Sequence, residues 1–137
     1  MLQKDYILRM LEMLGHLIAG ILGLLRKGEL VQAEDKLERL YYDFLKEDAS
    51  YFRKLPESRL TTDLLDRHNY SNGHLEILAE LFNAEAELCL AKGDKAGVLE
   101  NSRKSLILFE YIDMAYRTYS QDRIDKMDNL RRRIRVE

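Results

Sequence analysis

The chain has 137 residues, of which 34% are charged and 46% hydrophobic, and its formal net charge is −2. This apolar content is sufficient for a core and excludes a disordered chain, while the near-neutral charge gives no general attraction to nucleic acid or acidic lipid. One proline and seven glycines among many leucine, glutamate and lysine residues favour a single all-α domain. A lone cysteine, Cys89, cannot form an intrachain disulfide, so a reducing cytoplasm is the expected compartment.

The first predicted helix spans about residues 3–27. Its segment Met13–Leu25 carries no formal charge, but it is too short to cross a membrane and its flanks do not suit a signal peptide. We therefore expect a buried core helix and no membrane contact. Gly15, Ala19 and Gly23 lie at i, i+4 and i+8, which predicts a stripe of small residues against which a neighbouring helix packs closely.

Apolar residues recur at helical spacing in most of the remaining chain. Glycines and one proline mark the breaks between the segments. The pattern predicts five or six helices in all, and those after the first span about Leu30–Lys46, Pro56–Asp66, His74–Lys92, Asp94–Tyr116 and Asp122–Arg135. The domain therefore divides into a hairpin at 3–46, a degenerate middle at 47–73, a hairpin at 74–117 and a C-terminal helix at 120–135.

The two hairpins read alike around Gly28 and Gly93, which lie 65 residues apart in matching Lys-Gly-acid turns. In this alignment alanines, lysines and phenylalanines coincide on both sides of the turn, as in the pair Phe44 and Phe109. Any two helices joined by a tight glycine turn share part of this pattern, but matched small and apolar positions favour one unit used twice.

The stretch Leu81–Ile112 resembles a tetratricopeptide hairpin, with Phe82, Ala86 and Val98 at the expected distances from its Gly-Asp turn. It departs from that pattern at Glu85, where leucine is usual, and at Ser102, where an aromatic residue is usual. The spacing of 65 residues is close to twice the repeat period of about 34. We predict a tetratricopeptide-like array, and the alternative is a compact non-repeating helical bundle.

The whole chain also resembles a small family of uncharacterised bacterial proteins. The resemblance rests on "QKDYILRMLEMLGHLIAGILGL" at residues 3–24, on "KGELVQAEDKL" and on a later "KGDKAG". It implies a tetratricopeptide-like α fold in a cytoplasmic protein and implies no activity.

We therefore expect a non-enzymatic interaction or scaffold module that binds an unknown protein or peptide, or associates with itself. In tetratricopeptide-like arrays the first helix of each hairpin lines the concave face, which would place Glu80, Asn83, Glu87 and Leu90 against a partner. The corresponding residues of the first hairpin, Ile18, Leu22 and Leu25, are apolar, and we expect them at a homodimer interface.

One alternative is a metal-binding or enzymatic protein centred on His68 and His74, with Asp63 and Asp66 nearby. Their spacing matches no strong zinc signature, so we expect no metal, cofactor or catalytic residue there. Cys89 falls at a core position and shows no base partner, which favours packing over nucleophilic chemistry.

A second alternative is nucleic-acid or anion binding by the basic run at 131–135. Asp122, Asp125 and Asp128 precede these arginines at helical spacing, so ion pairs within the helix explain much of the cluster and make nucleic acid an unfavoured partner.

Overall fold

The computed structural model describes residues 2–67, 70–116 and 119–136, which form seven α-helices and one short 3-10 helix, with no strand among them. The predicted all-α class is confirmed, although the helix number exceeds the expected five or six. The α-helices are α1 (Leu2–Arg26), α2 (Leu30–Leu45), α3 (Ala49–Lys54), α4 (Leu60–Arg67), α5 (Asn72–Lys92), α6 (Lys95–Tyr116) and α7 (Gln121–Val136), and the 3-10 helix η1 is Glu57–Arg59.

The two Lys-Gly-acid turns adopt the same backbone structure. Gly28 and Gly93 both have positive φ, 79° and 77°. In the first turn the N–H of Glu29 donates to the carbonyl of Leu24 at 2.9 Å, and the N–H of Gly28 donates to that of Leu25. The same two bonds recur 65 residues later, in the turn at Gly93, so both helices end in a Schellman motif.

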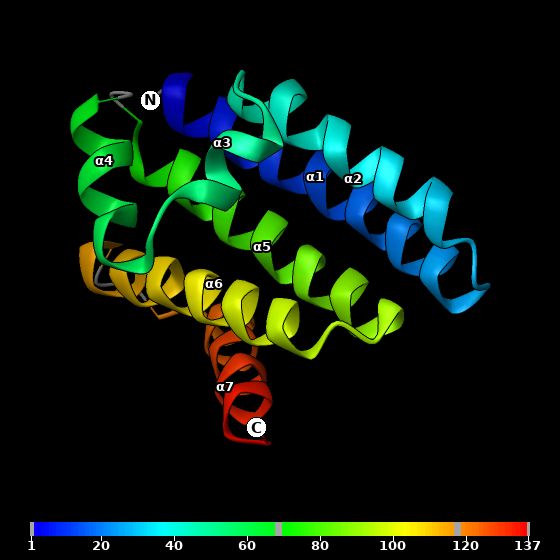
Figure 1. Ribbon diagram of the computed structural model, residues 1–137. Coiled ribbons are helices and arrows are strands. Elements are labelled where there is room, and N and C mark those ends of the chain that lie inside the picture. Colours follow the sequence, from blue (N-terminus) through cyan, green and yellow to red (C-terminus); the bar gives the residue numbers. More distant parts are fainter. Residues whose placement is uncertain (1, 68–69, 117–118, 137) are drawn as a thin grey trace.

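Helix α5 is the centre of the molecule. Its buried residues occupy most of its circumference and leave only the side of Glu80, Asn83 and Glu87 half-buried. It packs against α1 and α2 on one side and α6 on another. Figure 1 shows α5 running between the α1–α2 pair and α6, with α7 crossing beneath α6. A helix that is apolar nearly all round is stable in water only when neighbours cover it on every side.

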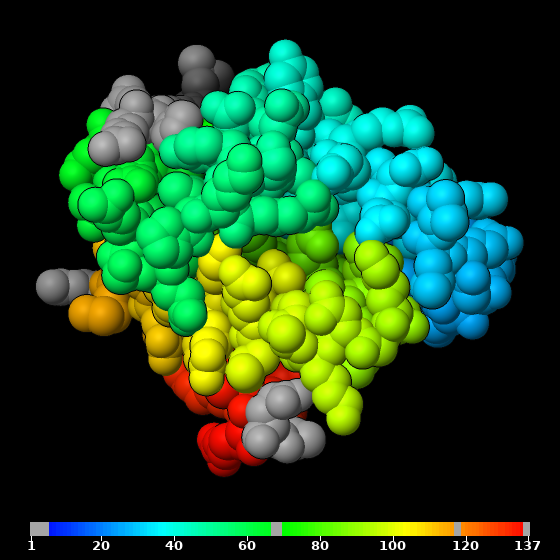
Figure 2. Space-filling view, in the orientation of Figure 1, coloured from blue at the N-terminus to red at the C-terminus, as the bar shows by residue number. Residues whose placement is uncertain are grey.

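The middle segment differs from the prediction in one respect. A six-residue helix, α3, replaces part of the expected break, and it inserts Phe52 into the core, where the ring stacks on Tyr41 with centroids 5.8 Å apart. Leu60 and Leu64 of α4 are also buried. Figure 2 shows that the middle segment and α6 close over much of α5.

The prediction that the first helix is a buried core helix is wrong. Of the described side chains of α1, only Leu14 and Ile21 are buried, while Tyr6, Leu8, Met13 and Leu17 are exposed. Within the described residues, Tyr6–Arg26 is the one segment long and apolar enough to cross a membrane, judged by length and composition alone, and 11% of its most apolar window is buried.

The predicted close helix packing at the small-residue stripe is not found in the described part of the chain. A methyl group added at Gly15 would meet open space, and at Gly23 it would meet only the side chain of Arg26, at 3.8 Å. The side of α1 that carries the stripe therefore faces outward.

The positive φ of Gly93 leads to a stability prediction. Gly93→Ala should lower the free energy of unfolding by about 1 kcal/mol, because an L-residue resists this conformation even where its Cβ has space. Gly20→Ala, in an exposed helical position, should instead raise it by about 0.5–1 kcal/mol. Chemical denaturation followed by circular dichroism measures both, and equal signs would contradict the turn assignment.

Candidate functional site

A buried carboxylate joins the two hairpins. Glu85 of α5 is 4% exposed, and its Oε1 accepts a hydrogen bond from the hydroxyl of Tyr41 at 3.1 Å and one from Arg53 at 2.7 Å. Arg53 also pairs with Glu38 at 2.9 Å. Burial, followed by the charge of Glu85, raises the pKa of Tyr41 well above its ordinary value, so this hydroxyl stays a hydrogen-bond donor.

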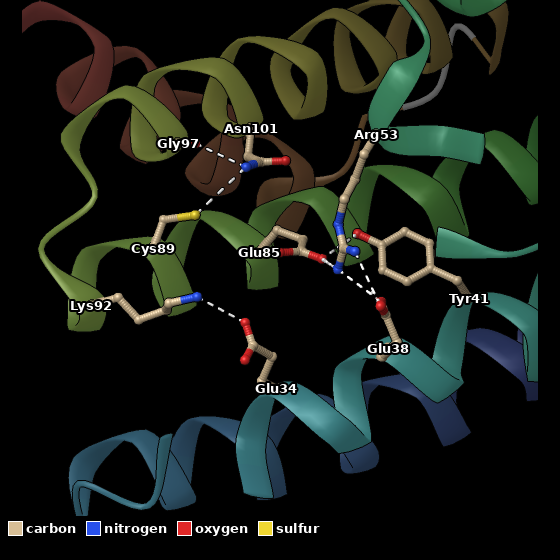
Figure 3. A network of polar contacts seen from close by, with 9 residues as sticks. All are labelled: Glu34, Glu38, Tyr41, Arg53, Glu85, Cys89, Lys92, Gly97 and Asn101. Atoms are coloured by element: carbon tan, nitrogen blue, oxygen red, sulfur yellow. Dashed lines mark hydrogen bonds and ion pairs between the residues drawn. The ribbon is translucent and has the colours of Figure 1, made fainter. Parts of the chain in front are cut away.

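The Glu85 network borders a groove of about 280 Å³ between α2, α5 and α6 (Figure 3). Five carboxylates and three basic side chains line the groove, and each basic side chain is paired with at least one carboxylate. Lys104 is the most buried of the three, and its Nζ donates to the backbone carbonyl of Arg53 at 2.9 Å. Ion pairs along the groove therefore balance the charges that α2, α3, α5 and α6 contribute to it.

Cys89 lies at the floor of this groove, beside Asn101, whose amide nitrogen is 3.8 Å from the sulfur. Burial, and then the carboxylates of Glu85 and Asp94, raise the pKa of the thiol to about 11. A thiolate is the nucleophilic form of cysteine, so this environment disfavours covalent chemistry near neutral pH.

The residues predicted to face a partner already have partners within the chain. Lys126 of α7 pairs with Glu80, and Arg133 of α7 contacts both Asn83, at 2.9 Å, and Glu87. Leu90, the fourth predicted residue, is exposed. Helix α7 thus occupies most of the face expected to bind a partner, which the sequence pattern did not predict.

The residues predicted to mediate self-association are half-buried. Ile18 and Leu25 pack against the core, and Leu22 is also partly covered. The exposed apolar residues Tyr6, Met13 and Leu17 lie on another side of the helix, with the exposed Gly20 among them. We call this side of α1 the outer face. Leu8 is also exposed, but it lies on the opposite flank of the helix.

His74 has a structural role at the start of α5. Its Nδ1 accepts a hydrogen bond from the N–H of Ser71 at 3.1 Å, and Ser71 in turn caps the backbone N–H of His74. The ring stacks on Tyr70 at 4.8 Å. His68 lies outside the described residues, and the described residues contain no group of three or more His, Cys, Asp or Glu side chains arranged to hold a metal.

Two of the four C-terminal arginines form ion pairs. Arg131 pairs with Glu110 of α6 and with Asp128, and Arg133 pairs with Glu87. These contacts attach α7 to α5 and α6, and they leave less free positive charge for an external anion.

The groove was not predicted, although one signal for it was visible. Glu85 was recognised as a departure from the tetratricopeptide pattern, and a carboxylate in an apolar helical stripe must find a buried partner. Its partner Arg53 comes from α3, a helix that was itself not predicted.

Comparison of the chain with protein-family models, curated proteins and solved structures found no match.

The Glu85 network gives a prediction about stability. Arg53→Met should cost about 2 kcal/mol, because it leaves the carboxylate of Glu85 buried beside Tyr41 without its cation. Arg53→Met combined with Glu85→Leu should recover at least about 1 kcal/mol. Lys92→Met, which removes the exposed pair with Glu34, is the control and should cost less than about 0.5 kcal/mol. Additive losses in the double variant would contradict the network.

The His74 cap gives a prediction about pH. Burial lowers the pKa of His74 in the folded chain, so the unfolded chain takes up the proton first as pH falls. The free energy of unfolding should therefore be highest above about pH 6.5 and should decline as the pH falls below that value. His74→Gln keeps a side-chain acceptor in the capping box and should flatten this part of the profile. Denaturation midpoints of both chains across this range provide the test, and parallel profiles would argue against the cap.

Proposed function

We propose that this chain is a non-enzymatic protein–protein interaction module, a tetratricopeptide-like cytoplasmic protein whose outer face on α1 is the docking surface. The observation that carries the proposal is the exposure of Tyr6, Met13 and Leu17 on one side of α1, with Gly20 beside them. Soluble domains rarely expose contiguous apolar surface unless a partner covers it.

Comparison of α1 with α5 supports this proposal. In the 65-residue alignment Met13 and Leu17 correspond to Leu78 and Phe82, which are completely buried. Phe82 lies against Tyr41 of α2, with ring centroids 6.5 Å apart. The exposed side of α1 therefore corresponds to the side of α5 that packs against the first hairpin. No hairpin packs in the same way against α1 among the described residues.

The two alternatives receive less support. A metal or enzymatic centre at His68 and His74 would compete with the role of His74 as a cap, and the raised pKa of Cys89 disfavours a cysteine nucleophile. Nucleic-acid binding by the C-terminal arginines would depend on Arg132 and Arg135, since Arg131 and Arg133 are held in ion pairs.

Photo-crosslinking in the native cells tests the proposal. A photoreactive amino acid at Leu17 should yield protein adducts, because this side chain faces the docked partner. The matched control is Met114 of α6, which is 77% exposed and lies outside the outer face. Absence of adducts at Leu17, or equal yields at both positions, would overturn the proposal.

A further inference from the structure

We propose that the outer face of α1 binds an amphipathic α-helix of another protein, which lies antiparallel to α1 and carries an acidic residue beside Lys27. This inference rests on the proposed function, since it names the class of partner that docks on α1. The observation that carries it lies within the chain: α5 has a surface equivalent to the outer face of α1, and the helix packed against that surface is α2.

The contacts between α2 and α5 define how such a helix lies. Tyr41 of α2 contacts Phe82, with ring centroids 6.5 Å apart, and its hydroxyl donates a hydrogen bond to Glu85. At the end of α5, Lys92 pairs with Glu34 of α2 at 2.8 Å (Figure 3). Residue numbers rise along α5 as they fall along α2, so the two helices are antiparallel.

The equivalent positions of the first hairpin are exposed. Leu17, Gly20 and Lys27 lie 65 residues before the three residues of α5 that contact α2. Leu17 is 43% exposed, and Met13, Gly20 and Lys27 are exposed as well. The first hairpin therefore presents to solvent the kind of surface that, on α5, receives a helix.

Lys27 has no partner within the described part of the chain. Its side chain forms neither an ion pair nor a hydrogen bond with another described residue, whereas the equivalent Lys92 pairs with Glu34. An exposed ion pair adds little affinity, but it selects the orientation of the docked helix because like charges repel. We therefore expect an acidic residue in the partner at the position that Glu34 holds in α2.

Gly20 makes the remaining contact apolar. The equivalent position of α5 holds Glu85, which needs Arg53 and the hydroxyl of Tyr41 as partners. Gly20 brings no carboxylate to be neutralised, and a Cβ added there would meet open space. A large apolar side chain of the docked helix can therefore lie over Gly20, beside Leu17, as one of the anchors at helical spacing that such helices use.

A peptide with the sequence of α2, Leu30–Leu45, is the probe, because this helix packs against the equivalent surface of α5. An isolated helix of this length is marginally stable in water, so a hydrocarbon staple replaces the exposed residues Arg39 and Asp43. The fluorescent peptide should bind the full chain saturably in an anisotropy titration. Absence of binding up to about 1 mM of the chain would overturn the proposal.

Leu17→Glu tests where the peptide binds. It should raise Kd by at least about 10-fold, because it places a carboxylate in the apolar contact. Met114→Glu changes an exposed apolar residue outside the outer face and should leave Kd unchanged. Circular dichroism establishes that both variants fold, and an equal Kd for the two folded variants would contradict binding at the outer face.

Charge exchange tests the orientation of the docked helix. Lys27→Glu should raise Kd by about 3-fold, because the carboxylate of Glu34 in the peptide then meets a like charge. A peptide carrying Glu34→Lys should restore the affinity of this variant, since the pair is again of opposite sign. The control is Lys92→Glu, which should leave Kd unchanged. A Kd that responds to Lys92→Glu and not to Lys27→Glu would place the peptide on α5 and overturn the proposal.

The remaining outcomes separate this inference from the proposed function. A peptide that fails to bind, together with cellular adducts at Leu17, would overturn the helical partner and leave the interaction module standing. Binding of the peptide without cellular adducts would support the helical partner and overturn the proposed function. A chain that does not bind the peptide but dimerises in sedimentation velocity, or co-floats with phospholipid vesicles, would overturn the inference in favour of a second copy or a lipid surface.

Discussion

Helix α5 must be covered on every side, and the other helices are arranged to do this. Its buried residues, such as Leu75, Phe82 and Leu88, point toward different neighbours, so no single partner helix can shield them. The first hairpin covers one side and α6 another, and α7 lies over the polar side that carries Glu80, Asn83 and Glu87. Buried residues of α3 and α4 join the same core. Each of the two Schellman turns joins two consecutive helices with only a few residues.

The buried carboxylate of Glu85 determines how α2 and α3 are positioned beside α5. The carboxylate of Glu85 can be buried only where Arg53 and the hydroxyl of Tyr41 reach it, and these groups come from α3 and α2. Burying an ion pair contributes little net stability compared with an apolar replacement, whereas separating the pair is costly. The network therefore contributes mainly to specificity, because α3 and α2 cannot shift along α5 without leaving a buried carboxylate unpaired.

The helices of this fold were predictable and much of its surface was not. Strong local signals marked the long helices, since Gly28 and Gly93 end helical stripes and Asp94 caps the next helix by accepting the N–H of Gly97. Helix α3 has six residues, too few for a recognisable period. The attachment of Arg133 to Asn83 and Glu87 joins positions about fifty residues apart, and no local pattern encodes such a contact.

The wrong prediction that α1 is a buried core helix has a more general cause. Its apolar residues recur at the helical spacing that is typical of a core helix. This spacing indicates that one side of the helix packs against something, but it does not show whether that segment belongs to the same chain. At α5 the equivalent positions, Leu78 and Phe82, are covered by the first hairpin, but no preceding hairpin covers Met13 and Leu17 among the described residues. The two ends of the molecule therefore differ in chemistry: α7 carries paired charges that face water at one end, whereas α1 exposes apolar side chains at the other.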